Sequence, residues 1–180
     1  VGARQVGKST MVQFPEIGGG RSYHSLDDFA ALGLAQTDPQ GLLGSADCLT
    51  IDEAQRVPDL LRAIKQQVDR ERRPGRFLLT GSADLNFTAD LARVLAGRVG
   101  VIRLRPLSWR ERAGHLDAPK LAGWVSATAL SSIEEDLSSA SLPPLDRETI
   151  FTGGYPPAVA ASSPRARDLW FESFRYTYLE

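Results

Sequence analysis

The first 113 residues alternate between short apolar runs of strand length and longer segments with helical spacing. The apolar runs lie at residues 22–26, 47–51, 76–80 and 100–104. Between the second and third runs, apolar side chains recur on one face of a helix that has Pro58 in its first turn. That face consists of Leu60, Leu61, Ile64 and Val68. Strands separated by helices predict a parallel sheet with helices on both faces, which is an α/β fold.

Other boundaries follow from residues that start or stop helices. A short helix over residues 8–14 is expected to end before Pro15, because proline lacks an amide donor and clashes with the preceding turn. The aspartates at positions 27–28 suit the N-cap of a weak helix over residues 29–35. Serine and glutamate at the two ends of residues 108–111 match a capping box, which predicts one more helix.

The composition changes after about residue 113. Residues 114–146 are rich in Ser, Ala, Pro and Gly and contain one predicted helix, near residues 132–137, so we interpret them as a linker or a variable insertion. Residues 147–180 end in an aromatic helix that starts near Pro164. We interpret this last part as a junction and the start of a second, truncated domain.

The charge balance and the cysteine content narrow the class of protein. The 180 residues carry 21 basic and 22 acidic side chains, for a formal net charge of −1. This balance gives no support to nucleic-acid or anionic-membrane binding. A single cysteine, Cys48, cannot form an internal disulfide, and no run approaches the roughly 18 apolar residues of a membrane span. We therefore expect a cytoplasmic protein, and the absence of Met or a signal-peptide pattern at the N-terminus predicts a fragment.

The strongest chemical motif opens the chain. Residues 2–9 read G-x-x-x-x-G-K-[ST], in which glycines let backbone amides surround a phosphate, Lys8 reaches the β and γ phosphates, and the Ser9 hydroxyl ligates Mg²⁺. The alternative is a glycine turn before a surface helix. The expected nucleotide-binding residues are Gly2, Ala3, Arg4, Gln5, Val6, Gly7, Lys8, Ser9 and Thr10.

A second motif, CLTIDE at residues 48–53, is an apolar strand that ends in two carboxylates. In P-loop hydrolases the first acid at such a strand end holds the magnesium shell, which predicts that Asp52 acts opposite Ser9. The second acid, Glu53, is placed to accept a proton from an attacking water. Taken alone, an Asp-Glu pair after a strand is more often a helix cap, but the phosphate loop favours the catalytic interpretation.

Three further residues are candidates for contacts with the γ-phosphate. The third strand ends in Thr80 and Ser82, which point to the same side of an alternating strand, so either hydroxyl could touch the phosphate or orient the water. A turn serine is the plain alternative. Arg98 could stabilise the transition state in its own subunit or in a neighbouring one. The alternative for Arg98 is an ordinary surface arginine.

The stretches GARQVGKST, SLDD, CLTIDEAQRVPDLLRAIKQQVDRERRPGRFLLTGSA and LAGRV together resemble the prokaryotic AAA+-like ATPases that usually carry a C-terminal domain of unknown function. The resemblance covers about residues 2–112, and the later GGYPPAV and YLE resemble that family's junction into the second domain. It implies that residues 1–113 form an AAA+-like ATP-binding domain. It also implies Walker A roles for Lys8 and Ser9, and Walker B roles for Asp52 and Glu53.

In the family fold, the strand that precedes the phosphate loop lies between the strands at residues 76–80 and 100–104, and only Val1 stands in that place here. We therefore expect the first strand to be missing. A central strand of about five residues would bury about three aliphatic side chains, worth roughly 1.5 to 3 kcal/mol each. The chain is then expected to fold poorly or to leave an open slot beside residues 76–80.

These features predict an ATP-binding and Mg²⁺-dependent ATP-hydrolysing domain that passes its nucleotide state to a C-terminal domain, with ATP and Mg²⁺ as cofactors. One alternative is a switch that binds ATP tightly, turns it over slowly and acts on a protein partner or a second copy of itself. A small-molecule kinase shares the phosphate loop and is the third interpretation. The adjacent carboxylates favour water as the acceptor.

Overall fold

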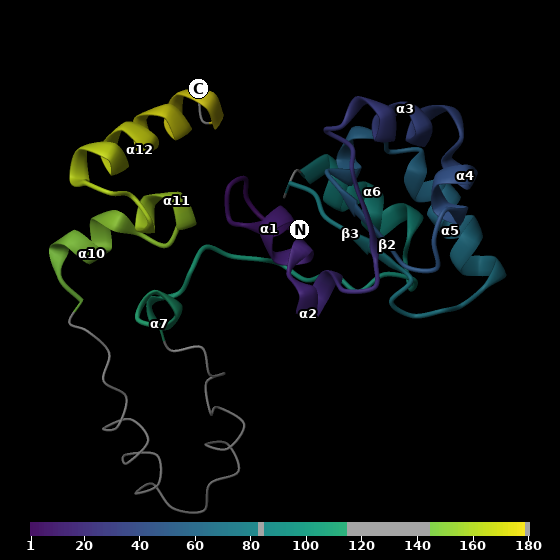
Figure 1. The fold of residues 1–180 in the computed structure, drawn as a ribbon, viewed down its shortest axis with the longest axis horizontal. Coiled ribbons are helices and arrows are strands. Elements are labelled where there is room, and N and C mark those ends of the chain that lie inside the picture. The colour runs from purple at the N-terminus through teal and green to yellow at the C-terminus, as the bar shows by residue number, and fades with distance from the viewer. Residues whose placement is uncertain (83–84, 115–144, 179–180) are drawn as a thin grey trace, which may run out of the picture. The chain divides into compact units, whose positions relative to one another are not determined.

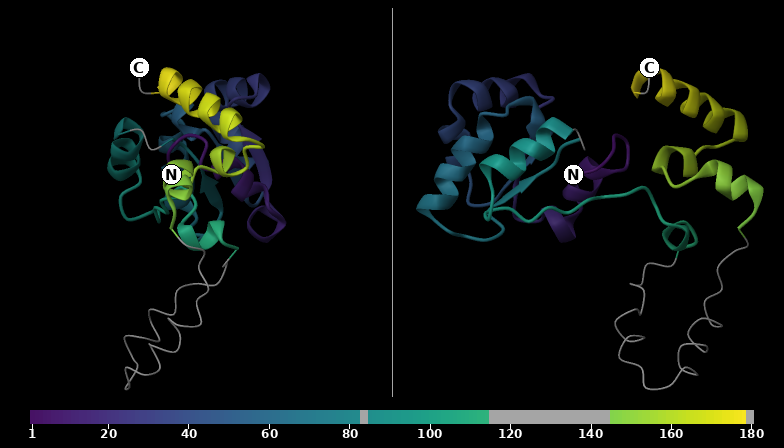
Figure 2. Two further views of the ribbon diagram at one scale, coloured as in Figure 1. Left: turned by 90° about the vertical axis from the view of Figure 1, so that its left-hand side faces the viewer. Right: turned by 180° about the vertical axis from the view of Figure 1, so that it is seen from behind.

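A computed structural model describes residues 1–82, 85–114 and 145–178 of this protein. The chain divides into two compact units, Val1–Arg105 and Pro106–Glu180. The first unit holds the sheet and both sequence motifs, and the second is helical in its described residues (Figures 1 and 2). The predicted helix near residues 132–137 lies outside the described residues.

A three-stranded parallel sheet lies at the centre of the first unit. Its strands are β1 (Ser22–Ser25), β2 (Leu49–Asp52) and β3 (Phe77–Leu79), in the order β1-β2-β3. Their register aligns Tyr23 with Thr50 and Leu78, so these three side chains share one face. The α/β fold with a parallel sheet flanked by helices is therefore confirmed.

Helices follow each strand and fill the connections. They are α1 (Lys8–Gln13), α2 (Pro15–Gly18), α3 (Phe29–Thr37), α4 (Pro39–Gly44), the 3₁₀ turn Ala54–Arg56, α5 (Leu60–Arg70) and α6 (Leu85–Val94). Asp28 caps α3 by accepting from the amides of Ala30 and Ala31, both at 2.9 Å. The predicted end of α1 before Pro15 is confirmed, but the proline then starts α2, which the sequence did not predict. A proline suits the first turn of a helix, where its missing amide has no intrahelical partner.

The main core lies on one face of the sheet. On this face Ile51 of β2 is fully buried, and α5 contributes Leu60, Leu61 and Ile64, each at most 2% exposed. Those three residues belong to the helix face expected from the sequence. Each buried aliphatic side chain of this kind contributes about 1.5 to 3 kcal/mol. The opposite face carries Asp52, at the end of β2, and is therefore the face on which the chemistry is placed.

The fourth predicted strand, at residues 100–104, is wrong as a regular strand. Only an isolated bridge forms there, between Leu104 and Gly2. Gly2 also bridges to Ser82, so the backbone at Val1 and Gly2 lies between the segment after β3 and residues 100–104. Among the described residues, Leu104 is the only member of residues 100–104 that forms a bridge to another segment. Ile102 stays 77% exposed.

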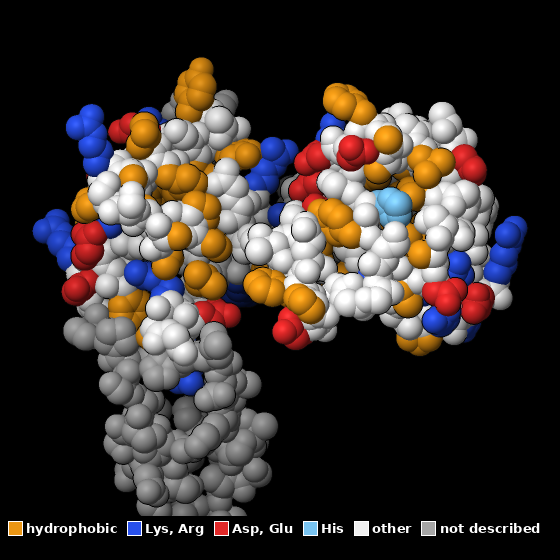
Figure 3. All heavy atoms as spheres, in the orientation of Figure 1, with side chains coloured by type: hydrophobic (Ala, Val, Ile, Leu, Met, Phe, Trp, Pro, Cys, Tyr) orange, Lys and Arg blue, Asp and Glu red, His pale blue; other side chains and the backbone are white. Residues whose placement is uncertain are grey.

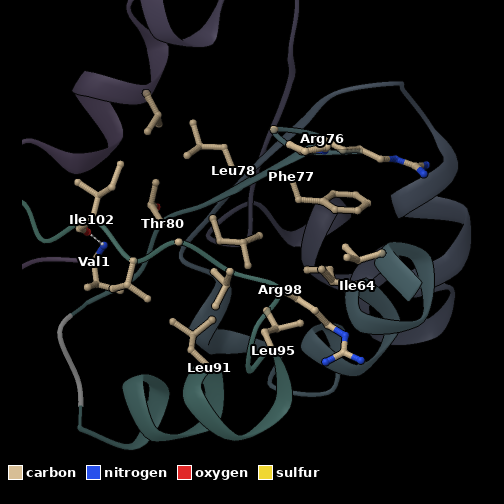
Figure 4. A pocket seen from close by; sticks show the side chains of 18 of the residues that line it. Val1, Ile64, Arg76, Phe77, Leu78, Thr80, Leu91, Leu95, Arg98 and Ile102 are labelled. Carbon is tan, nitrogen blue, oxygen red and sulfur yellow. Dashed lines mark hydrogen bonds between the residues drawn. The ribbon is translucent and has the colours of Figure 1, made fainter. Parts of the chain in front are cut away.

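A cavity of about 670 Å³ lies beside β3, where the sequence predicts an open slot. It is lined mainly by apolar side chains from β3, α5 and α6, among them Phe77, Leu79, Ile64, Leu91 and Leu95. Figure 4 shows Val1 and Ile102 at the same end of this cavity as Thr80, with the hydrogen bond from the Val1 amino group to the Ile102 carbonyl at 2.8 Å. Val1 therefore lies at one end of this apolar cavity.

The second unit contains α7 (Trp109–Arg112), α10 (Arg147–Thr152), α11 (Pro156–Val159) and α12 (Pro164–Tyr178). Ser108 and Glu111 form the predicted capping box at α7. Aromatic rings hold α12 against the segment before α11, since the Tyr155 ring lies 5.5 Å from that of Trp170 and 5.2 Å from that of Phe174. Figure 3 shows many hydrophobic side chains on the visible surface.

Candidate functional site

The phosphate loop contains two residues with a left-handed backbone, of which only Gly7 is a glycine. Gln5 and Gly7 both have positive φ values, 62° and 91°, and Gly7 is the N-cap of α1. A left-handed conformation costs glycine little, whereas other residues rarely adopt it. The Met11 amide donates to the Gly7 carbonyl at 2.9 Å, which starts the helix directly after the loop. Lys8 and Ser9 are therefore the first residues of α1.

Lys8 is the buried cation of the site, with only 7% of its surface exposed. Its Nζ donates to the Ala3 carbonyl at 2.8 Å, inside the same loop. Burial lowers the pKa of Lys8, and the charges of Glu53 and Asp52 act in the opposite direction, in that order of strength. This coupling shows that the fold brings the loop lysine into the electrostatic range of both carboxylates.

Asp52 is the last residue of β2 and is 3% exposed. Hydroxyl groups on its two sides donate to its two carboxylate oxygens. Thr80, which follows β3, donates to Oδ1, and Tyr23 of β1 donates to Oδ2 at 2.7 Å. A buried carboxylate with a donor on each oxygen is held in a defined orientation.

Glu53 follows Asp52 in a left-handed conformation, with φ 57° and ψ 40°. Its amide donates to the Thr80 hydroxyl at 3.3 Å, while its Oε2 accepts from the side-chain amide of Gln55. The Ala54 amide donates to the Thr80 carbonyl at 2.9 Å. The turn after β2 is thus tied to Thr80, and the Glu53 carboxylate is held by a neighbour two residues along the chain.

Thr80 and Ser82 lie in different settings, although the sequence could not choose between them. Thr80 is 4% exposed and bonds Asp52 directly. Ser82 pairs through its backbone with Gly2, at the start of the phosphate loop. Both residues therefore lie at the carboxyl end of β3, and only Thr80 contacts an acid of the site in the described structure.

Arg98 is not brought to this group within its own chain. Its Nε and a terminal nitrogen bind Asp69 of α5, at 2.5 and 3.2 Å. Asp69 is near the end of α5, and the chain then leads into the start of β3. This amino end of β3 is opposite to the carboxyl ends of the strands, where Asp52 and Glu53 lie. Figure 4 shows Arg98 toward the Phe77 end of the cavity and Thr80 toward the other end. A role for Arg98 in a neighbouring subunit stays a prediction.

Tyr23 is the site residue that the sequence analysis missed. Strand alternation could have indicated it, because Tyr23 and Ser25 share a face and the register aligns Ser25 with Asp52. Tyr23 is 37% exposed, and its partial burial, followed by the bond to Asp52, raises its pKa to about 12. A tyrosine hydroxyl is protonated at neutral pH in any case, so Tyr23 is the donor in the bond to Asp52.

The residues present fit a nucleotide with Mg²⁺. A phosphate loop with a buried lysine suits the phosphates, while the Ser9 hydroxyl and the Asp52 carboxylate are oxygen ligands of the kind Mg²⁺ prefers. Within the described residues, no group of three or more His, Cys, Asp or Glu could hold a metal ion by itself.

Fold and site together define a P-loop nucleotide-binding domain. Residues 1–113 match the sequence pattern of a family described as AAA domain, and the chain belongs to that family. Over 185 aligned residues it is 31% identical to an uncharacterized protein of Mycobacterium bovis and to one of Mycobacterium tuberculosis. Each alignment covers 99% of this chain and 34% of the relative, so the chain spans about a third of their length.

No solved structure matches the chain significantly. Family membership implies nucleotide binding, and the two relatives add no activity of their own. Across the parts of the chain that the structure describes, none of the helices has both the length and the apolar character of a membrane span.

Proposed function

We propose that this chain binds ATP with Mg²⁺ and hydrolyses it. The observation that carries the proposal is that the start of the phosphate loop pairs with the segment after β3: Gly2 bridges to Ser82, and Thr80 of the same segment donates to Asp52. Amides of the loop at residues 2–9 and the Lys8 ammonium hold the phosphates. Ser9 and Asp52 hold the metal ion, which neutralises charge on the phosphate oxygens when bound.

Glu53 is the proposed general base. It lies directly after the metal acid, is partly exposed, and can take a proton from a water that attacks the γ-phosphate. The Thr80 hydroxyl orients the turn that carries Glu53, because it accepts from the Glu53 amide. Ser82, beside Gly2, is the second candidate for contact with the γ-phosphate.

The experiment that tests this proposal is release of inorganic phosphate from MgATP with no added acceptor. We expect Lys8→Ala to abolish release and Glu53→Gln to reduce it at least about tenfold while ATP binding persists. Glu16→Gln, an exposed acid on α2, is the matched control and should retain wild-type turnover. Release that requires an added small molecule would instead identify a kinase, and Glu53→Gln with full turnover would exclude Glu53 as the base.

A slow nucleotide-operated switch is the second candidate, because one contact favours it. Gln55 donates to the Glu53 carboxylate, so a neighbouring side chain engages the proposed base. Turnover would then wait for this contact to break. A single-turnover measurement separates the candidates: Gln55→Ala should accelerate hydrolysis in a restrained switch and leave the rate unchanged in a plain hydrolase.

We further propose that the nucleotide state is passed toward the C-terminal part of the protein. The segment that leads into the second unit is attached directly to the start of the phosphate loop. Leu104 bridges to Gly2, and its amide donates to the Val1 carbonyl at 2.8 Å, two residues before the second unit begins at Pro106. A change at the loop can therefore reach that unit through this hydrogen-bonded bridge and the backbone that follows Leu104.

A further inference from the structure

We propose that Tyr23 is a positioning residue that sets the affinity of the site for Mg²⁺, by fixing the Asp52 carboxylate. This inference rests on the proposed function, and it assigns Tyr23 a role that neither sequence motif contains. Tyr23 is argued to act through Asp52 and not to touch nucleotide or metal itself.

The sheet register explains how Tyr23 reaches Asp52. Tyr23 is aligned with Thr50 on β2, so Asp52 is its diagonal neighbour on the same face. A tyrosine is long enough to span such a diagonal, and its hydroxyl lies 2.7 Å from Oδ2. Because Thr80 donates to Oδ1 from the other neighbouring strand, the carboxylate is held from both sides.

This arrangement limits which lone pairs of Asp52 remain for a metal-bound water or a metal ion. Each oxygen of a carboxylate can accept more than one hydrogen bond, so one donor on each oxygen leaves the remaining lone pairs in a fixed direction. Residues that orient a ligating carboxylate typically change metal affinity by about 10 to 100 fold when they are removed. Loss of the Tyr23 hydroxyl is therefore expected to act on the metal more than on the nucleotide.

The test compares wild type with Tyr23→Phe, which keeps the ring and removes only the hydroxyl. Binding of the fluorescent analogue mant-ATP is measured in EDTA and then during a Mg²⁺ titration. We expect Tyr23→Phe to raise the apparent Mg²⁺ dissociation constant about tenfold while mant-ATP affinity in EDTA stays within about twofold of wild type. Tyr176→Phe, on exposed α12, is the matched control and should change neither quantity.

Two results would overturn the assignment. An unchanged Mg²⁺ curve would show that Asp52 does not need Tyr23. Equal loss of binding with and without Mg²⁺, together with a lower melting temperature, would show a purely structural role. Wild-type protein that binds no mant-ATP under either condition would refute the proposed function itself, and the role of Tyr23 with it.

Discussion

The carbonyl oxygen of Leu104 lies 2.5 Å from the position that a Cβ atom on Gly2 would occupy. A side chain at position 2 must therefore push the Leu104 segment away from the start of the phosphate loop. Gly2→Ala is predicted to lower the melting temperature and to speed hydrogen exchange at the Leu104 amide, which donates to Val1.

The matched control for this substitution is Gly33→Ala. Gly33 lies inside α3, and a Cβ there would meet nothing within 4 Å. Alanine in a helix interior is favoured over glycine by roughly 0.5 to 1 kcal/mol, so Gly33→Ala should raise the melting temperature. Equal effects from the two variants would contradict the tight contact at Gly2.

The cavity beside β3 predicts that an added strand will stabilise the chain. An apolar extension of five residues, such as VIVIV placed before Val1, would extend the backbone of Val1 and Gly2 along β3 and pair with that strand. It would bury several aliphatic side chains at about 1.5 to 3 kcal/mol each. We expect a rise of at least about 5 °C in the melting temperature, measured by circular dichroism.

A Gly-Ser extension of the same length is the control, because it can lie beside β3 without filling the apolar cavity. It should leave the melting temperature within about 2 °C of that of the 180-residue chain. Equal stabilisation by both extensions would mean that the cavity is not a strand site.

The Thr80 hydroxyl is predicted to support both stability and metal binding. Thr80→Val keeps the shape but leaves a buried oxygen of Asp52 without its donor, which typically costs about 1 to 3 kcal/mol. Urea unfolding should show this loss, and Thr80→Ser should recover most of it. If the valine variant unfolds at the wild-type urea concentration, the bond to Asp52 contributes nothing to stability.

The pair of Arg98 and Asp69 predicts a specific pH dependence of stability. The hydrogen bond from Arg98 lowers the pKa of Asp69 below its ordinary value of 3.8. A carboxyl group with a depressed folded-state pKa stabilises the protein above its unfolded pKa and loses that contribution as the pH falls through the folded one. Asp69→Asn should therefore lower stability at pH 7, and its difference from wild type should shrink as the pH falls below 3.8 and through the lowered pKa.

The same pair makes a prediction for activity. Since Arg98 is bound to Asp69, away from Asp52 and Glu53, Arg98→Ala should keep phosphate release by the isolated protein within about threefold of wild type. Loss as large as that of Lys8→Ala would show that Arg98 reaches the γ-phosphate. Loss that depends on protein concentration would instead support a role in a neighbouring subunit.

The parts of the site that the sequence predicts are those that depend on local chemistry. The loop around Lys8 and the acids at positions 52–53 are recognisable because each motif consists of residues that lie close together in the sequence. The sequence does not predict the role of Tyr23, because that role depends on the register of β1 against β2. This pairing is not visible in residues that are adjacent in the sequence. The partner of Arg98 escaped for the same reason, as Asp69 lies 29 positions away.

The fold shows the same division between local and non-local causes. Capping by Asp28 and the apolar face around Ile64 predict α3 and α5 correctly. Residues 100–104 have the apolar character of a strand, yet a strand needs a regular ladder with a neighbour, and among the described residues only Leu104 of this segment bridges to another segment, at Gly2. Propensity alone therefore predicts an element there that pairing does not complete.

The central claim is that the loop around Lys8 forms a nucleotide site. It is tested most directly by an equilibrium titration of the chain with MgATP, measured by calorimetry for wild type, Lys8→Ala and the control Lys65→Ala on α5. We expect saturable binding of MgATP by wild type and Lys65→Ala. In a folded Lys8→Ala variant the affinity for MgATP should be lowered at least tenfold. Equal MgATP affinity in Lys8→Ala and wild type would contradict this claim.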